Sequence, residues 1–301
     1  MTLLLTGSDV TSLLTLDDCI AAVEEAFRSH GAAGILSAHA DRGAFHIKAA
    51  TVGGRFGAKA NANFPGTTPS IKGVMLLFDT SDGRLLALLD SIELTVLRTG
   101  AATAVAAKYL ARKDSKTVAV YGCGRQGRVQ LEAIKRVLPI ERVYAYDADP
   151  ARASALAGAD CVRPNPGEDA DVIITCTPST SAYLEHARPG TFIAAVGADN
   201  PTKSEIAPSL MQSSRVVADV LEQCAEIGDL RSAIAAGVMT KHDVHAELRD
   251  ILNGRKPGRT NDGEVFIFDS TGVGFQDTAA ASIAYDRAVE QHRGLEVDLA
   301  R

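Results

Sequence analysis

The stretch that most constrains the fold of this chain runs from residue 117 to residue 147. It opens with a short apolar run at 117–121, and a G-x-G-x-x-G pattern follows at once. Apolar residues then recur at helical spacing through 128–137, and a second apolar run at 142–146 ends on Asp147. Short runs with β-branched residues predict strands, and the helical spacing predicts an amphipathic helix. The expected order is therefore strand, glycine turn, helix, strand and acid.

This order is the one that a dinucleotide-binding βαβ unit requires. Gly122 would permit the tight turn, Gly124 would let the backbone approach a pyrophosphate, and Gly127 would let the helix pack on the sheet. The helix N-terminus would present unpaired N–H groups to the phosphates. Asp147, 20 residues after Gly127, can accept hydrogen bonds from ribose hydroxyls. The alternative is a glycine-rich turn without a ligand, and the presence of both strands, the helix and the acid favours the nucleotide site.

Composition bounds the remaining possibilities. With 301 residues, 46% of them apolar and 23% charged, the chain is expected to form two globular domains. A net charge of −6 without clustered basic residues argues against nucleic acid as a partner. No stretch is long and apolar enough for a membrane span, and the first residues lack the features of a secretory signal. Five widely spaced cysteines without a C-x-x-C pattern predict reduced thiols in the cytoplasm and no metal site.

Apolar periodicity predicts an α/β chain. The first ninety residues are predicted to form a helix at 15–29 followed by a mostly antiparallel sheet. Asp82 and Gly83 are expected in a hairpin turn of that sheet. Its strand-like runs are interrupted by Gly53, Gly54 and Gly57. An alanine-rich helix at 92–111 leads into the βαβ unit. Downstream strands are expected at 172–176, 191–196, 215–219 and 264–269, and downstream helices at 151–157, 225–235 and 277–291. This alternation predicts a parallel sheet covered on both faces.

Several residues could carry chemistry. The loops at 176–180 and 197–201 follow predicted strands, where ligands bind in doubly wound sheets, although their residues are also ordinary turn formers. Arg98 lies in a helix that is apolar or small on every other face, so it is expected to be buried with an anionic partner. That partner is either an internal acid such as Glu93 or Asp90, or the carboxylate of a substrate.

Other polar residues leave similar alternatives. Lys59 lies among small residues downstream of Arg42 and Lys48, and the three cations form either an anion site or ordinary surface charge. His242 and His245 could share a helix face, but without a third ligand we interpret them as surface residues.

Four separated motifs resemble the ornithine cyclodeaminase/μ-crystallin family. They are the segment 94–102 around Arg98, the glycine turn at 122–126, the segment 197–205 that contains Asp199, and the segment 268–277. The resemblance covers nearly the whole chain, and from residue 117 onward the chain looks most like the archaeal-type alanine dehydrogenase branch.

The resemblance implies a Rossmann domain, 111–272, with a doubly wound parallel sheet. This domain is inserted into a discontinuous, mostly antiparallel α+β domain, 1–110 plus 273–301, that binds substrate and dimerises. The implied cofactor is NAD, with NADP as the alternative. We expect the cofactor at Gly122, Gly124, Arg125, Gln126, Gly127, Asp147, Thr177, Pro178, Val196, Gly197 and Ala198.

The resemblance also implies that Arg42, Lys59 and Arg98 hold a substrate carboxylate. Asp199 would handle the amine or relay a proton, so the expected catalytic residues are Lys59, Arg98 and Asp199. Residues 45–50 stand where the family usually carries a Met-Pro-Ala turn. Lys48, within that stretch, either adds a donor to the substrate site or only fills the gap.

The implied function is that of a cytoplasmic, homodimeric NAD(P)-dependent oxidoreductase acting on the C–N bond of a small α-amino or cyclic α-imino acid. The leading forms are a Δ1-pyrroline-2-carboxylate (ketimine) reductase and an alanine dehydrogenase. One alternative is an ornithine cyclodeaminase, which forms proline and ammonia and recycles NAD in situ. Another is a μ-crystallin-like binding protein without catalysis. The altered stretch at 45–50 favours the reductase over the cyclodeaminase.

Overall fold

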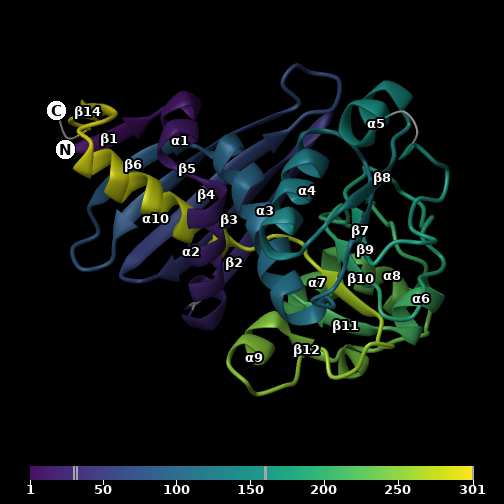
Figure 1. Cartoon of the computed structure of the whole chain (residues 1–301). Coiled ribbons are helices and arrows are strands. Elements are labelled where there is room, and N and C mark those ends of the chain that lie inside the picture. The colour runs from purple at the N-terminus through teal and green to yellow at the C-terminus, as the bar shows by residue number, and fades with distance from the viewer. Residues whose placement is uncertain (30, 32, 159–160, 300–301) are drawn as a thin grey trace. The chain divides into compact units, whose positions relative to one another are not determined.

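The computed structural model describes residues 1–29, 31, 33–158 and 161–299 (Figure 1). The chain forms two compact units, Met1–Ala101 with Val273–Arg301, and Ala102–Gly272. The second unit is thus inserted into the first. The first boundary falls inside the helix α3 (Ser91–Leu110), whereas the sequence predicts it at the end of that helix.

The first unit is built on a sheet of seven strands in the order β14-β1-β6-β5-β4-β3-β2. The strands are β1 (Thr2–Leu5), β2 (Ala33–Ala40), β3 (Gly43–Val52), β4 (Arg55–Asn63), β5 (Ile71–Asp79), β6 (Leu85–Asp90) and β14 (Leu295–Val297). Only the pairing of β1 with β6 is parallel, so the predicted mostly antiparallel sheet is confirmed. The hairpin at Asp82 and Gly83 joins β5 to β6, and Gly83 has a φ of 74°.

Helices cover one face of this sheet. They are α1 (Gly7–Leu13), α2 (Leu16–Ser29) and α10 (Gly274–Glu290), and α10 packs against α2, β3 and β4. The prediction that Gly57 breaks a strand is wrong, because β4 runs through it. A Cβ at Gly57 would lie 2.3 Å from Oγ1 of Thr278 in α10. Glycine is needed there because the helix approaches the strand closely, and not because the strand ends.

The second unit is built on a parallel sheet in the order β12-β11-β13-β10-β9-β7-β8. Its strands are β7 (Thr117–Tyr121), β8 (Arg142–Tyr146), β9 (Val172–Thr175), β10 (Phe192–Ala195), β11 (Arg215–Ala218), β12 (Ala246–Glu247) and β13 (Phe266–Asp269). Every residue of β9, β10 and β13 is buried, which is typical of a sheet covered on both faces. From β8 the chain returns past β7 to β9. The direction of winding therefore reverses beside β7, where ligands bind in such sheets.

The helices of this unit are α4 (Arg125–Val137), α5 (Pro150–Ala157), α6 (Pro208–Ser213), α7 (Leu221–Ile227), α8 (Asp229–Ala235), α9 (Leu248–Leu252) and the 3₁₀ turn η2 (Lys241–Asp243). The single helix predicted at 225–235 is wrong, because α7 and α8 are separated by Gly228. The backbone of Gly228 is extended, and a Cβ there would lie 2.6 Å from the Asp269 carboxylate. That carboxylate accepts from the backbone N–H of Leu230 at 2.9 Å, so it holds the start of α8.

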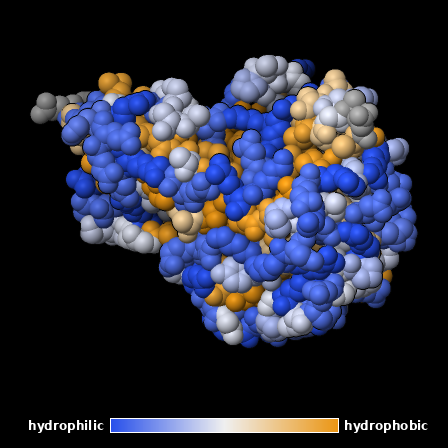
Figure 2. Space-filling model, viewed as in Figure 1, coloured by the Kyte–Doolittle hydropathy of each residue, from blue (hydrophilic) through white to orange (hydrophobic). Residues whose placement is uncertain are grey.

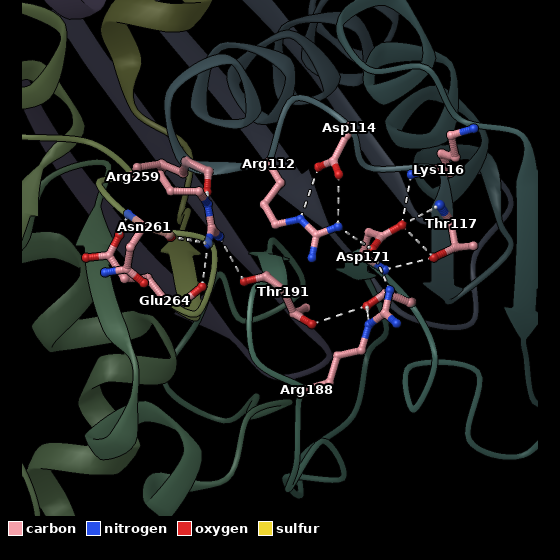
Figure 3. Close-up of polar contacts among 12 residues, drawn as sticks. Arg112, Asp114, Lys116, Thr117, Asp171, Arg188, Thr191, Arg259, Asn261 and Glu264 are labelled. Carbon is pink, nitrogen blue, oxygen red and sulfur yellow. Dashed lines mark hydrogen bonds and ion pairs between the residues drawn. The ribbon is translucent and has the colours of Figure 1, made fainter.

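Polar contacts also join the loops at the amino ends of the parallel strands (Figure 3). Asp171 accepts from the backbone N–H groups of Lys116 and Thr117 and pairs with Arg188. Arg259 donates to backbone carbonyls of three separate segments, and Glu264 accepts from the backbone N–H of Thr260 at 2.8 Å. These contacts lie at the opposite end of the strands from the glycine turn, and they connect the loops at that end to one another.

Hydrophilic residues cover most of the face in Figure 2, with hydrophobic ones in separate patches. Among the described residues, no helix combines the length and hydrophobicity needed to cross a membrane.

Candidate functional site

The glycine turn between β7 and α4 has a geometry that glycine alone permits. Gly122 has a φ of 90°, and a Cβ there would lie 2.6 Å from the carbonyl oxygen of Cys176. A Cβ at Gly127 would lie 2.0 Å from the carbonyl oxygen of Gly122. A Cβ at Gly124, in contrast, would meet no atom within 4 Å. Contacts inside the protein therefore explain two of the glycines, and the open space beside the third fits a ligand that approaches the backbone.

Helix α4 begins at this turn without a side-chain cap. Gly124 is the N-cap residue, and no side chain accepts from the helix start. Arg125 is exposed, whereas Nε2 of Gln126 is buried without a hydrogen-bond partner. A helix of 13 residues without a side-chain cap and with an unpaired amide donor at its start is suited to an anion such as a pyrophosphate.

Asp147 stands directly after β8, beside the glycine turn. Its Oδ2 accepts from the backbone N–H of Cys123 at 2.7 Å, and its Oδ1 accepts from the backbone N–H of Asp149 at 2.9 Å. Each carboxylate oxygen has two lone pairs, so both can still accept from a ribose hydroxyl. Asp147 therefore holds the turn and can still accept hydrogen bonds from ribose hydroxyls, as the sequence predicts.

Two further loops lie at the same edge of the sheet. Thr177 and Pro178 follow β9, and Val196, Gly197 and Ala198 follow β10. Because β7, β9 and β10 are adjacent parallel strands, their carboxyl ends and the loops after them lie side by side. Val196 and Ala198 are buried, Thr177 is half-buried and Pro178 is exposed. All the predicted cofactor residues thus stand at the carboxyl edge of one sheet.

In the first unit, a buried ionic cluster joins three elements. Lys59 of β4 and Arg98 of α3 are each 4% exposed, and Asp277 of α10 is fully buried. Oδ1 of Asp277 accepts from Nζ of Lys59 at 2.9 Å and from Nε of Arg98 at 2.8 Å. Lys59 also donates to Oγ1 of Thr95 at 3.2 Å, and Nη1 of Arg98 donates to Oε1 of Gln276 at 2.8 Å.

These bonds leave polar atoms of the cluster unused. Oδ2 of Asp277 and Nε2 of Gln276 are buried without a hydrogen-bond partner. Among the described residues, Nη2 of Arg98 also has no protein partner within bonding distance. When both cations are charged they exceed the single carboxylate by one positive charge. A buried excess charge is costly, so a monoanionic ligand would stabilise the cluster.

Burial controls the titration of the cluster. It lowers the pKa of Lys59 from 10.5 to about 7, since the attraction of Asp277 only partly offsets desolvation and Arg98 and Lys48 add repulsion. Burial acts in the opposite sense on Asp277, but the charges of Arg98 and Lys59 outweigh it and the pKa of Asp277 is lowered. Lys59 can therefore exchange a proton near neutral pH while Asp277 stays ionised.

The structure decides between some of the alternatives for these cations. Arg98 is buried as predicted, but its acidic partner is Asp277 and neither Glu93 nor Asp90. Asp90 instead caps α3 by accepting from the backbone N–H groups of Ile92 and Glu93. The interpretation of Lys59 as a surface charge is wrong, because its side chain is covered.

The other predicted cations lie at different depths. Lys48 of β3 is directly opposite Lys59 in the sheet register and is half-buried. Arg42 lies in the exposed turn between β2 and β3, away from this row of the sheet. Residues 45–50 form the middle of β3 and make no turn.

Asp199 lies in the second unit, in the loop after β10. Its side chain is 52% exposed, and its Oδ1 accepts from Nζ of Lys203 at 2.8 Å. It is therefore accessible, and its assignment as a proton relay stays a prediction.

The sequence does not single out Gln276 and Asp277 as site residues, although both fall inside one of the motifs of the family resemblance. The available signal is an acid at the start of an alanine-rich helix. Arg98 and Lys59 lie 179 and 218 residues away from Asp277 in the chain, so only the folded structure shows these contacts.

Comparisons with known proteins agree with this arrangement. Residues 1–292 match the model of the ornithine cyclodeaminase/mu-crystallin family. Alanine dehydrogenase of Archaeoglobus fulgidus is 36% identical over 319 residues, covering 100% of this chain and 99% of that protein.

Two solved structures are similar over almost their whole length. An archaeal alanine dehydrogenase dimer with bound NAD has a TM-score of 0.94 and 35% identity, and covers 99% of each chain. The Thermococcus litoralis Δ1-pyrroline-2-carboxylate reductase in complex with NADH and L-proline has a TM-score of 0.92 and 30% identity, over 98% of this chain and all of that one. On these matches, the chain belongs to the ornithine cyclodeaminase/mu-crystallin family.

Proposed function

We propose that this protein is an NAD-dependent oxidoreductase that acts on the C–N bond of a small α-amino or α-imino acid. The observation that carries the proposal is the Lys59–Asp277–Arg98 cluster, a buried group with excess positive charge and unused donors. The same chain carries an open glycine turn and an uncapped helix start suited to a dinucleotide. Relatives named alanine dehydrogenase and Δ1-pyrroline-2-carboxylate reductase support the substrate class.

The substrate carboxylate would bind to Arg98 and Lys59. The bonds from Arg98 to Asp277 and Gln276 fix the guanidinium plane, so the donors that remain point in a fixed direction. The arriving carboxylate would neutralise the excess charge and favour protonated Lys59. Lys48, beside Lys59 in the sheet, would add a further positive charge, and Arg42 is the weaker candidate because it lies in the exposed turn.

The cofactor would bind along the carboxyl edge of the parallel sheet. The pyrophosphate would lie at the start of α4, against the turn that contains Gly122, Gly124 and Gly127 and beside Arg125 and Gln126. Asp147 would bind the ribose hydroxyls. When bound, the nicotinamide supplies or accepts the hydride that is exchanged with the α-carbon of the substrate. The protein residues bind, orient and move protons.

Two groups could manage the proton on nitrogen. Lys59 has a pKa of about 7 before the substrate carboxylate arrives, so it can exchange a proton near neutral pH. Asp199 is exposed and held by Lys203, and could accept from an amine or relay a proton. We assign the catalytic roles to Lys59, Arg98 and Asp199.

A substrate screen tests this function. Purified protein is mixed with NADH and a panel of cyclic imino acids or of α-keto acids with ammonia, and the absorbance of NADH is followed. We expect the absorbance of NADH to fall with at least one member of the panel. Binding of NADH without turnover of any member of the panel would contradict the proposal and favour a binding protein.

We also propose that the chain forms a homodimer through the uncovered face of its antiparallel sheet. Leu36, Ile47 and Val74 lie in one row across the sheet, and Leu36 and Phe45 are 64% and 48% exposed. An exposed sheet face is ordinarily polar, so an apolar one indicates a partner. The similar archaeal structure is described as a dimer. Leu36→Lys with Phe45→Lys should give a monomer by light scattering, and an unchanged mass would refute this interface.

A further inference from the structure

Glu205 is a buried carboxylate that the proposed function leaves without a role. It is fully covered, although it lies close to the loops at the carboxyl ends of β9 and β10. A buried acid is costly unless donors surround it, so its position calls for an explanation.

The two oxygens of Glu205 bind different loops. Oε1 accepts from the backbone N–H and the hydroxyl of Thr177, each at 2.6 Å, and from the hydroxyl of Tyr183 at 2.8 Å. Oε2 accepts from the backbone N–H of Gly197 at 2.9 Å. One carboxylate thus connects the loop after β9 to the loop after β10.

Glu205 approaches the second loop at a glycine. A Cβ at Gly197 would lie 2.3 Å from Oε2 of Glu205, so a larger residue there would displace the carboxylate. The main chain of Glu205 is itself fixed, because its N–H donates to Oδ1 of Asp229 at 2.8 Å and its carbonyl accepts from Tyr183 and Leu184 at 3.0 Å. Glu205 is therefore a rigid spacer between Thr177 and Gly197.

The order of the strands places these loops along a bound dinucleotide. Asp147 follows β8, the pyrophosphate turn follows β7, and Thr177 and Gly197 follow β9 and β10. A dinucleotide that lies across this edge with its adenosine ribose at β8 must extend its other half toward β9 and β10. The β9 loop contacts the turn, because Sγ of Cys176 donates to the carbonyl oxygen of Gly122 at 3.1 Å.

We infer that Glu205 is a positioning residue for the nicotinamide half of the cofactor, acting by holding the Thr177 and Gly197 loops at a fixed separation. This inference rests on the proposed function. Hydride transfer is sensitive to small displacements of the reacting groups, so a carboxylate that sets this separation controls the rate without touching the reacting atoms.

Glu205→Gln is the informative change. A carboxylate can accept on both oxygens, whereas the amide nitrogen of glutamine only donates. A backbone N–H also only donates, so either Thr177 or Gly197 loses its bond and the separation of the loops relaxes. Burial raises the pKa of Glu205 and the bonds from Thr177 oppose that rise.

Glu264→Gln is the matched control. The side chain of Glu264 is 7% exposed and likewise holds a loop by accepting from the backbone N–H groups of Thr260 and Asn261. It belongs to the network at the opposite end of the strands (Figure 3). Both variants should lose thermal stability, but only Glu205→Gln should change the position of the nicotinamide half of the cofactor.

The test compares NADH with ADP, which has no nicotinamide half. Wild-type protein must bind NADH, and failure to do so would refute the proposed function itself. In Glu205→Gln we expect kcat to fall about tenfold or more, while the Kd of ADP stays within about twofold of wild type. Glu264→Gln should keep both values.

Two results would overturn the inference. One is a Glu205→Gln variant with unchanged kcat and unchanged NADH affinity, and the other is an equal loss of ADP and NADH binding. If Glu205→Gln does not fold, Tyr183→Phe removes one donor to Oε1 and should lower kcat in the same way to a smaller extent. An unchanged kcat in folded Tyr183→Phe would then count against Glu205.

Discussion

Arg98→Lys tests how the protein holds a substrate. The substitution keeps the charge but removes the planar fork that now binds Asp277 through Nε and Gln276 through Nη1, each at 2.8 Å. An ammonium has one nitrogen, and it cannot satisfy Asp277, Gln276 and a ligand carboxylate in the same directions. Each charge-assisted bond contributes about 1.5–3 kcal/mol, so the loss of one or two should cost about 3 kcal/mol in the transition state. We therefore expect kcat/KM to fall by a factor of about 100.

The same substitution elsewhere in the first unit provides the control. Arg55 binds Asp286 through both Nη atoms, on the surface between β4 and α10. Arg55→Lys should change stability slightly and leave kcat/KM unchanged. Steady-state kinetics and NADH titration on both variants give the answer. Normal kinetics in folded Arg98→Lys, or a loss that appears equally in NADH affinity, would refute the role of Arg98 in binding substrate.

Three further changes probe the other groups. Asp147 should make the protein prefer NADH over NADPH, and Asp147→Ser should reduce that preference, measured as kcat/KM. A wild-type preference of tenfold or more for NADPH, about 1.4 kcal/mol, would contradict this role. Asp199→Asn should slow turnover by about 100-fold if this carboxylate relays a proton, and an unaltered rate would exclude it. Asp277→Asn leaves Arg98 and Lys59 without their anion and should cost about 3 kcal/mol in the free energy of unfolding. Without Asp277, the pKa of Lys59 in the folded protein should fall below about 7, whereas unfolded Lys59 keeps its proton up to about 10.5. The loss of unfolding free energy should therefore be larger at pH 6 than at pH 8, as measured by denaturant titration.

Local patterns in the sequence predict much of the fold. The βαβ unit at 117–147 and the alternation after it are confirmed, because strand and helix periodicities are local properties of the chain. The predictions are wrong where contacts between residues far apart in the sequence determine the local structure. Gly57 lies inside β4 since Thr278 packs against it, and Gly228 separates two helices since Asp269 stands beside it. The short strands β1 and β14 pair with each other from opposite ends of the chain.

The candidate site divides in the same way. Burial of Arg98 follows from the apolar helix around it, which is visible in the sequence. Its partner does not follow, because Asp277 is 179 residues away in the chain. The acids nearest to Arg98 in the sequence are Glu93 and Asp90, but Asp90 caps α3 by accepting from the backbone N–H of Glu93. The roles of Arg42 and Asp199 stay predictions.

The stoichiometry of NADH tests the central claim most directly. The protein is incubated with Δ1-pyrroline-2-carboxylate and NADH, and in parallel with ornithine and a catalytic amount of NAD, and proline is measured in both. We predict one NADH consumed for each proline formed from the imino acid and no proline from ornithine. Proline from ornithine at a comparable rate, with no net change in NADH, would contradict the oxidoreductase and establish a cyclodeaminase.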